Sequence, residues 1–479
     1  MDLSTKYQKK TDKEHILSNP DTYIGSVELV DNVEYIFNND TDSIVSKQIN
    51  VIPGLYKLFD EGIVNCRDHC IRMKQASVED STNTHKVTKI DVCVGEDGEI
   101  SFHNDGNGID VAKHPEYNVW IPELIFGHLR TGTNYNKDEK KIVGGKNGFG
   151  VKLIYIWSTE GTLETIDHKR GLKYKQTFTS NLDVIGEPVI SKSKAKPYTK
   201  ITFKPDYKRL GIETITPDIV QLFKKRVYDI AAITEKSVKV SWNSSVVPVK
   251  EFQDYIGLYI GKNERAHEQP SDRWEYVVAL TNTGEYNQVS FVNGIYTAKG
   301  GKHVDYILNQ ITKKVIAVIL KKKKIEVKPA VIKEQLMLFV RCDIENPAFD
   351  SQTKDYMNTP VSKFGSTCVV SDKFIDKVIK LGVMESACEL TNVKENKNAK
   401  KTDGNKSKSI RGIPKLVDAN YAGTAKSHLC KIIFCEGDSA KAGIISGLST
   451  DDRNYIGVYP MKGKIFTVRG ETTNRISEN

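Results

Sequence analysis

The chain has 479 residues, of which 39% are hydrophobic and 27% are charged, the composition of an ordinary soluble protein with about three domains. Its 70 lysines and arginines outnumber its 61 aspartates and glutamates, which favours a polyanionic partner. The polar N-terminus argues against a secretory signal, and the longest apolar run, near Val315–Leu320, is too short to span a bilayer. We therefore expect no membrane association.

The eight cysteines include no C-x-x-C pair, the spacing typical of metal-binding and redox-active thiols. We expect reduced thiols in a nuclear or cytosolic compartment. No internal repeat is evident.

The first strong helical pattern covers about Pro53–Lys74. Its apolar positions recur every three or four residues, at Leu55, Leu58, Phe59, Ile63 and Cys66. A second face carries Glu61, Asn65 and Asp68, which places a carboxylate beside an amide. Without further context, this polar stripe is more typical of a solvated helix face than of a site. Gly62 is unusual here, because glycine inside a helix costs about 1 kcal/mol relative to alanine.

Two strands are predicted next, at Ile90–Val94 and Glu99–His103, joined by a tight turn. The following residues, 104–108 (NDGNG), have two interpretations. They form either another turn or a holder for a base-like ligand, in which Asp105 accepts a hydrogen bond from an exocyclic amine. A long polar segment then begins near Leu124, and loops of this length often act as lids or lack order.

The segment Ile142–Ser158 (IVGGKNGFGVKLIYIWS) places four glycines within seven residues, directly before an apolar run typical of a helix. Glycines allow a backbone to approach a ligand closely, and a helix N-terminus offers unpaired N–H groups. The segment therefore suits a phosphate cradle. Its G-x-x-G-x-G spacing matches neither a Walker loop nor a Rossmann fingerprint, and a plain structural turn is equally compatible with it.

Three further strands are predicted at Thr162–Asp167, Leu172–Phe178 and Thr199–Phe203, the first two as a hairpin. Thr216-Pro217-Asp218 then has the features of a helix start: a capping hydroxyl, a proline in the first turn and an acid near the helix dipole. We place a domain boundary at this point.

The second unit shows a strand at Gln288–Tyr296, a helix at His303–Leu320 and a strand at Leu336–Ile344, which indicates a right-handed βαβ crossover. One face of the helix is apolar, at Val304, Ile307, Leu308, Ile311 and Val315. The run Lys321–Lys324 follows, where cations favour the helix dipole. Such a run is usually a solvated loop, and the alternative is contact with nucleic-acid phosphates.

The polar loop Asp350–Asp355 has the composition of a structural loop, and the lysine-rich stretch Thr391–Ser409 is typical of a flexible basic linker. A short buried-type strand at Lys431–Cys435 then delivers Glu436 to its C-terminal end, where sites of α/β folds lie. That carboxylate either binds a divalent cation or belongs to a strand-end turn. Too few residues follow to complete an α/β sheet, so we expect this last domain to be truncated.

From about Tyr7 to the end, the sequence resembles the eukaryotic-type DNA topoisomerase II enzymes, of type IIA, in a series of motifs that agree in order and spacing. These motifs are YQKKT at Tyr7–Thr11, HILSNPDTYIGSVE at His15–Glu28, PGLYKLFDE at Pro53–Glu61, LIFG, TNY, GGKNGFG, SFVNGIYTAKGGKHVDY, ENPAFDSQTK, GIPKLVDAN and EGDSAKAG.

The resemblance implies an α/β (α+β) fold in three parts. Residues 1–215 are expected to form a GHKL ATPase domain, a sandwich with a Bergerat nucleotide site and an N-terminal arm. Residues 216–385 are expected to form a transducer domain that contains the βαβ crossover. A basic linker at 386–428 and the incomplete start of a TOPRIM α/β domain at 429–479 complete the chain.

The resemblance also implies catalytic roles. Glu61 matches the general base that activates the attacking water, and Asn65 matches the ligand of the magnesium ion on ATP. Gln352, Thr353 and Lys354 match a transducer loop that reaches into the site, where the lysine stabilises charge on the γ-phosphate.

Other residues match binding positions of the family. The expected nucleotide contacts are Tyr7 of an arm that crosses to the partner subunit, Asn104, Asp105, Gly132, Thr133, Asn134, Gly145, Lys146, Asn147, Gly148, Phe149, Gly150, Val151 and Lys152. Glu436 matches the first acidic magnesium ligand of TOPRIM. The run Lys321, Lys322, Lys323 and Lys324 occupies the place of a basic loop that senses DNA. Gly132 replaces a commonly hydroxylated position, and Gly62 and His69 alter the first helix.

The implied activity is the ATPase gate of a type II topoisomerase: ATP and Mg²⁺ bring two copies together around double-stranded DNA, and hydrolysis reopens the clamp. The expected location is the nucleus. The short arm before Tyr7 suggests a compact viral homologue, for which the location would be a viral replication compartment or the virion. The remaining TOPRIM carboxylates and the DNA-cleaving tyrosine are expected beyond Asn479, so we do not expect this chain to cleave DNA.

Two alternatives stay open at this point. The first, within the same ATPase superfamily, is a chaperone or mismatch-repair clamp, against which the EGDSA segment argues. The second is a non-catalytic DNA clamp that uses ATP only to dimerise.

Overall fold

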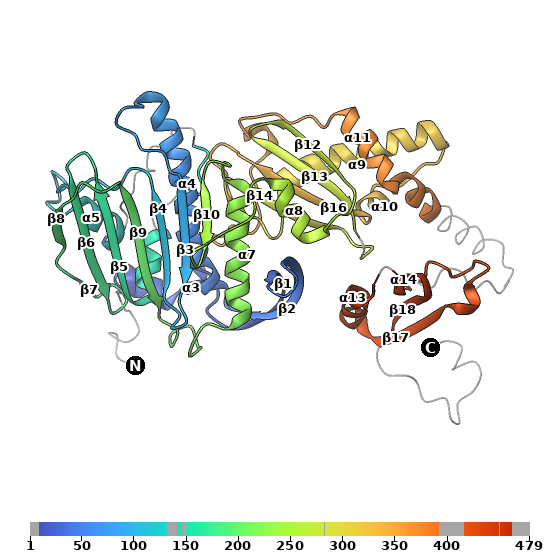
Figure 1. Cartoon of the computed structure of the whole chain (residues 1–479), viewed down its shortest axis with the longest axis horizontal. Helices are drawn as coiled ribbons and strands as arrows, with labels where there is room; N and C mark the ends of the chain where they lie inside the picture. The colour runs from blue at the N-terminus through green and yellow to red at the C-terminus, as the bar shows by residue number, and fades with distance from the viewer. Residues whose placement is uncertain are drawn as a thin grey trace, which may run out of the picture.

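The computed structural model describes residues 9–129, 131, 141–145, 150–281, 283–391, 416–449 and 451–461. These residues form two successive α/β units and a smaller third one (Figure 1). The mixed α/β class is the one that the sequence predicted.

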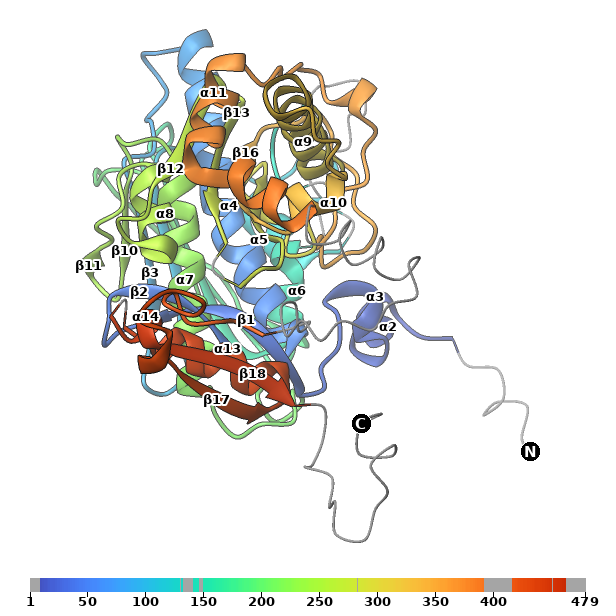
Figure 2. The ribbon, with the colours of Figure 1, turned by 90° about the vertical axis from the view of Figure 1, so that its right-hand side faces the viewer.

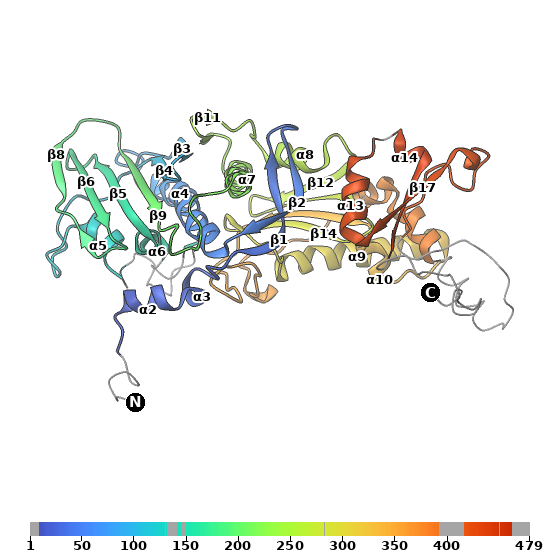
Figure 3. The same cartoon turned by 90° about the horizontal axis from the view of Figure 1, so that it is seen from below.

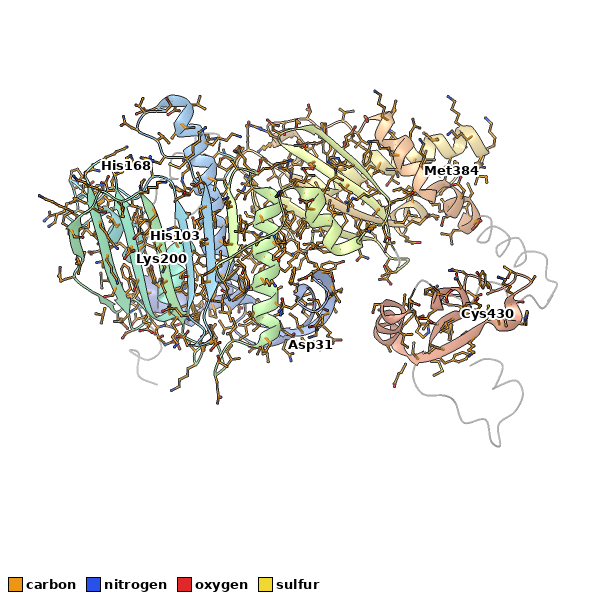
Figure 4. The ribbon with its side chains drawn as sticks, in the orientation of Figure 1. Asp31, His103, His168, Lys200, Met384 and Cys430 are labelled. Carbon is orange, nitrogen blue, oxygen red and sulfur yellow. The ribbon has the colours of Figure 1, made fainter. Side chains whose placement is uncertain are left out.

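The first unit is built on a nine-stranded sheet in the order β11-β10-β3-β4-β9-β5-β6-β7, in which β8 also pairs with β6. Its strands are β3 (Lys89–Val94), β4 (Ile100–Asp105), β5 (Ser158–Asp167), β6 (Leu172–Thr179), β7 (Val184–Ile185), β8 (Val189–Lys192), β9 (Tyr198–Pro205), β10 (Lys239–Trp242) and β11 (Ser245–Val246). Both predicted hairpins, β3–β4 and β5–β6, are confirmed. His103 and Lys200 mark the antiparallel pairing of β4 with β9 (Figure 4).

Helix α4 (Pro53–Glu79) is the long helix of this unit, and it continues past the predicted end at Lys74. Helices α5 (Ile121–Gly127) and α6 (Gly150–Ile156) pack against each other, and α6 also packs against α4. Helix α6 confirms the helix expected after the glycine-rich segment.

Aromatic packing explains the glycine inside α4. Phe59 stacks on Phe223 with 4.0 Å between ring centroids, and its centroid lies 5.1 Å from that of Phe102 on β4. A Cβ at position 62 would lie 2.3 Å from the Phe102 ring. Gly62 therefore lets the helix approach the sheet, which outweighs its low helix propensity.

Helix α7 (Pro217–Ile233) begins as predicted, since the Thr216 hydroxyl accepts a hydrogen bond from the Ile219 N–H. The helix packs on α4, and the strand that follows it, β10, pairs with β3 of the first sheet. The first unit thus extends beyond the boundary expected at residue 215, through β11. A helix start looks the same in sequence whether it opens a new domain or returns to the same sheet.

Two short helices, α2 (Asp12–Ser18) and α3 (Pro20–Tyr23), precede a hairpin of β1 (Val30–Asn38) and β2 (Ser43–Val51). The hairpin packs against α7 and against α8 (Phe252–Ile260), as seen from below in Figure 3. The hairpin therefore packs on both helices at the point where the chain passes from the first unit to the second.

The second unit contains a five-stranded sheet in the order β12-β13-β16-β14-β15. Its strands are β12 (Arg265–Ser271), β13 (Trp274–Leu280), β14 (Asn287–Val292), β15 (Ile295–Tyr296) and β16 (Leu336–Cys342). The prediction of a single strand at Gln288–Tyr296 is wrong. Asn293 and Gly294 adopt positive φ angles of 50° and 83°, and the chain turns there into the hairpin of β14 and β15.

Helix α9 (Lys302–Lys323) connects β14 to its parallel neighbour β16, so the predicted crossover between parallel strands is confirmed. All five of its predicted apolar positions are buried. The helix packs against α10 (Pro329–Lys333) and α11 (Asp372–Val378), and Figure 2 shows α9 beside α11. A π-helical turn, Ile379–Val383, follows α11.

The expected linker begins later than residue 386, because residues 384–391 are helical and Ala387 and Cys388 are buried in the second core. Except for Thr391, the lysine-rich stretch Thr391–Ser409 lies outside the described residues, as do residues 410–415. All eight cysteines are free thiols, in agreement with the expected reduced state.

The third unit pairs β17 (Lys431–Glu436) in parallel with β18 (Ile456–Met461), next to α13 (Gly437–Gly447) and α14 (Asp452–Tyr455). The strand expected to be buried is mostly exposed, with Ile432 at 46% and Phe434 at 57% of full exposure. A two-stranded sheet has too little partner surface to cover both faces of a strand. None of the helices described in the structure has the length and apolar character needed to cross a bilayer.

Candidate active site

A cavity of about 390 Å³ opens between α4, β4, α5, α6 and the loop of the second unit that carries Gln352 and Lys354. Phe102, Ile125 and Phe126 contribute to an apolar wall, whereas Glu61 and Lys354 bring opposite charges. An apolar slot with a few convergent charged groups is the usual form of a small-molecule site. Two distant regions of the chain therefore build one cavity.

Glu61 lies at the charged part of this cavity and pairs with two lysines. Its Oε1 is 2.7 Å from Lys57 Nζ, one turn earlier on α4, and 3.2 Å from Lys354 Nζ. All three side chains are buried. Burial alone would raise the pKa of Glu61, but the charges of Lys354 and Lys57 outweigh it and lower the pKa to about 2. Glu61 is thus held as a carboxylate on a helix face that the sequence pattern alone presented as solvated.

The predicted transducer residues reach this site. Lys354 also donates to the carbonyl of Gly144 at 3.4 Å, and it has a left-handed φ of 63°. Gln352 lines the cavity. Thr353 is placed differently: its hydroxyl bonds the Ser351 hydroxyl at 2.7 Å and lies 3.1 Å from an Asp355 carboxylate oxygen.

Asn65 lines the cavity one turn after Glu61. Its Nδ2 donates to the Glu61 carbonyl at 2.6 Å, which turns the amide so that Oδ1 is the atom left for a ligand. The described residues hold no cluster of three or more histidine, cysteine or acidic side chains that could bind a metal ion alone. One amide oxygen fits Mg²⁺, which is normally bound by one or two protein oxygens together with substrate phosphates and waters.

The glycine-rich segment is anchored to α4. Both oxygens of Asp68 accept backbone hydrogen bonds, from Gly144 at 2.9 Å and Gly145 at 2.8 Å. At Gly150 a Cβ would lie 1.8 Å from Glu61 Oε2, so only glycine lets the start of α6 approach the carboxylate this closely. The third residue of the predicted polar stripe, Asp68, therefore supports the glycine-rich segment.

Val151 and Lys152 line the cavity from α6. Lys152 Nζ donates to the Thr131 carbonyl at 2.6 Å, and burial lowers the pKa of Lys152 to about 8. The other residues predicted to contact the nucleotide from the arm and the loops lie outside the described residues, namely Tyr7, Gly132, Thr133, Asn134, Lys146, Asn147, Gly148 and Phe149.

The two residues predicted to lie under the base are separated by the alternation of β4. Asn104 is buried and lines the cavity. Asp105 does not line it, since its carboxylate accepts hydrogen bonds from the N–H groups of Thr88 and Lys89, at 2.7 Å and 2.8 Å, and from the Thr88 hydroxyl. Contact between Asp105 and a base stays a prediction. It would require Asp105 to give up its hydrogen bonds from Thr88 and Lys89.

Sequence reasoning assigned no role to three side chains that line the cavity, His69, Arg72 and Asp110, or to Lys57, which pairs with Glu61. His69 and Arg72 continue the row of Glu61 and Asn65 along α4, so helical spacing was the available signal. Burial lowers the pKa of His69 to about 4, which keeps the ring neutral at physiological pH.

The two outlying predicted sites are exposed. Lys321, Lys322 and Lys323 form the last turn of α9, and Lys324 ends the helix with a left-handed φ of 59°. Glu436 lies at the C-terminal end of β17, directly before α13, as expected. DNA binding by the lysine run and metal binding by Glu436 stay predictions.

Comparisons with known proteins agree with this architecture. Residues 232–408 match the family model described as DNA gyrase B. The chain is 42% identical over 497 residues to DNA topoisomerase 2 of Candida glabrata, covering 99% of this chain and 34% of the relative. It is 43% identical over 488 residues to DNA topoisomerase 2 of Acanthamoeba polyphaga mimivirus, covering 100% and 38%.

Two solved structures match closely. The ATPase region of Saccharomyces cerevisiae topoisomerase II is 40% identical, with a TM-score of 0.74 over 81% of this chain and 100% of that one. The ATPase and transducer domains of DNA topoisomerase II from Balamuthia mandrillaris are 38% identical, with a TM-score of 0.76 over 83% of this chain and 100% of that one.

The first unit, with its cavity between α4 and the glycine-rich segment, is a GHKL-type ATPase fold, and the second unit is a transducer. The chain belongs to the type II DNA topoisomerases, and most of it corresponds to their ATPase region. It spans about a third of the length of the curated relatives, 34% and 38% in the two cases above.

Proposed function

We propose that this chain is the ATP-operated gate of a type II DNA topoisomerase, in which ATP binding joins two copies around a DNA duplex and hydrolysis separates them. The observation that carries the proposal is the buried contact of Glu61 on α4 with Lys354 of the transducer, 3.2 Å apart. This contact joins the proposed general base in the first unit to the transducer, the unit that would move in response to ATP binding and hydrolysis. The eukaryotic and viral relatives favour action in the nucleus or in a viral replication compartment.

In the proposed reaction, Glu61 accepts a proton from water as the water oxygen attacks the γ-phosphorus of ATP and the bond to the bridging oxygen breaks. Lys354 and the glycine-rich segment with Lys152 stabilise charge on the phosphates. Asn65 would help to hold Mg²⁺, which supplies further neutralisation of the phosphate charge. Asn104 would lie beside the adenosine, while Gly132, Thr133, Asn134 and Tyr7 of the partner subunit stay proposed contacts.

The Glu61–Lys354 contact gives this reaction a built-in dependence on the nucleotide. A carboxylate with a pKa of about 2 is a weak base. The γ-phosphate competes with Glu61 for the Lys354 ammonium, and as that cation is withdrawn the pKa of Glu61 rises. Lys57, which lies on α4 itself, stays as the counter-charge. Binding of the γ-phosphate and activation of the base are therefore coupled.

The direct test is phosphate release from ATP and Mg²⁺ by the purified chain, with and without duplex DNA, together with its oligomeric state with a non-hydrolysable ATP analogue. We expect Mg²⁺-dependent turnover and nucleotide-dependent dimers. Dimers without phosphate release would instead indicate a clamp that uses ATP only to dimerise. Absence of both would contradict the proposal.

Reversing the charge of Lys321, Lys322, Lys323 and Lys324 to glutamate should remove most of the stimulation of turnover by duplex DNA, because a cationic surface binds DNA through release of counterions. Basal turnover should change little, since these side chains are exposed at the C-terminal end of α9. The segment that follows Lys354 lies at the other end of the helix, where the Lys302 N–H donates to the Met357 carbonyl. The measurement is DNA-stimulated phosphate release at several salt concentrations. An unchanged stimulation and salt slope would mean that the run is only a solvated helix end.

A further inference from the structure

The turn between β14 and β15 lies where the two units meet, and its asparagine side chain makes three backbone contacts. Asn293 is completely buried and has a left-handed φ of 50°. Its Oδ1 accepts the N–H of Ile344 at 2.7 Å. Its Nδ2 donates to the carbonyls of Ile344 at 2.8 Å and Val143 at 3.3 Å. One side chain therefore joins the segment after β16 to residues just before the glycine-rich loop.

Residues 141–145, which we call the stalk of the glycine-rich loop, are held by both units. From the first unit, Asp68 binds the N–H groups of Gly144 and Gly145. From the second unit, the Asn346 N–H donates to the Lys141 carbonyl at 2.9 Å, and the Asn346 Oδ1 accepts the Lys141 N–H at 3.3 Å. The stalk is thus part of the junction between the units.

The same junction leads to Lys354. Ile344 begins the segment that carries this lysine, and the Lys354 ammonium lies 3.4 Å from the Gly144 carbonyl of the stalk and 3.2 Å from Glu61. Any slip of the stalk against Ile344 would move the ammonium relative to Glu61. Such an error is costly, because a misplacement of about 1 Å can slow an enzyme about 100-fold.

We propose that Asn293 is a positioning residue for ATP hydrolysis: by tying Val143 to Ile344, it fixes the stalk of the glycine-rich loop against the segment that carries Lys354. Lys354 and the stalk are then held in one fixed arrangement beside Glu61. This inference rests on the proposed function, because it requires Lys354 to act on the γ-phosphate. It assigns Asn293 no contact with the nucleotide.

The test variant is Asn293→Gly, which removes the three side-chain bonds while keeping a residue that tolerates a positive φ. The matched control is Asn243→Gly in the β10–β11 turn. Asn243 has a φ of 44°, and its side chain also clamps one residue, accepting from the Val94 N–H at 2.9 Å and donating to the Val94 carbonyl at 3.3 Å. That clamp lies within the first sheet and does not touch the cavity lining.

We expect Asn293→Gly to lower kcat about tenfold or more, while the Kd of a non-hydrolysable ATP analogue changes about twofold or less, because positioning acts on the reacting geometry more than on binding. Asn243→Gly should leave both values unchanged. In a Lys354→Met background, Asn293→Gly should lower kcat little further, since the two residues act through one ammonium.

Asn293→Asp serves as a second variant if the glycine variant does not fold, because aspartate tolerates the left-handed backbone and keeps the bond from Ile344. It loses both donated bonds and should also lower kcat. Equal effects of Asn293→Gly and Asn243→Gly, additive losses with Lys354→Met, or failure of both Asn293 variants to fold would each overturn the inference. Absence of turnover in the parental chain would instead refute the proposed function.

Discussion

Glu61→Gln should reduce turnover by about 100-fold or more while the chain still binds a non-hydrolysable ATP analogue, because loss of a general base removes about 10² to 10⁴ in rate. The amide keeps the size and shape of the side chain but accepts no proton from water. The structure places this carboxylate in the cavity, between Lys57 and Lys354. The measurements are single-turnover phosphate release and analogue binding.

This variant leaves two buried ammonium groups without their shared carboxylate, so its stability needs a control. Removing one partner of a buried ion pair costs about 3–5 kcal/mol. Glu61→Asp keeps the charge but withdraws it by one methylene, so it should fold better and still turn over slowly. Glu79→Gln makes the same change at the exposed end of α4 and should be neutral. Parental rates in folded Glu61→Gln would show that another group is the base.

Lys354→Met should lower kcat by about 100-fold or more, with a smaller effect on analogue binding, because a preorganised donor aimed at developing charge acts mainly in the transition state. The variant should also shift the pH profile. With Lys354 gone, burial is opposed by Lys57 alone, so the pKa of Glu61 rises from about 2 towards or above its ordinary value. Since Glu61 acts as a carboxylate, and since kcat/KM reports the nucleotide-free enzyme in which Lys354 pairs with Glu61, the acid limb of kcat/KM should move to higher pH.

Lys363→Met provides the control, because Lys363 is an exposed lysine in the same unit. It should leave both kcat and the pH profile unchanged. A parental kcat in Lys354→Met would remove the proposed role of this lysine. A reduced kcat with an unshifted acid limb would keep the phosphate role and reject the coupling to Glu61.

The sequence by itself determined the elements whose signals are local. Helix α4, the hairpins β3–β4 and β5–β6, the capped start of α7 and the buried face of α9 follow from spacing and turn residues within single segments. Resemblance to a family then joined these segments into an ATPase with a transducer. Helical spacing also predicts that Glu61, Asn65 and Asp68 share one face of α4, but it does not predict that this face is buried.

Only the tertiary structure decided which of these groups meet. Glu61 and Lys354 are 293 residues apart, and no local pattern predicts that their side chains pair. Burial of Glu61 depends on the elements that surround the cavity, which include the loop of Lys354. The carboxylate of Asp105 is bound by the backbone just before β3 instead of facing the cavity. Strand β10 pairs with β3, so the first unit extends past the domain boundary expected at residue 215. These outcomes depend on long-range packing, which balances desolvation against pairing and has no counterpart in a short stretch of sequence.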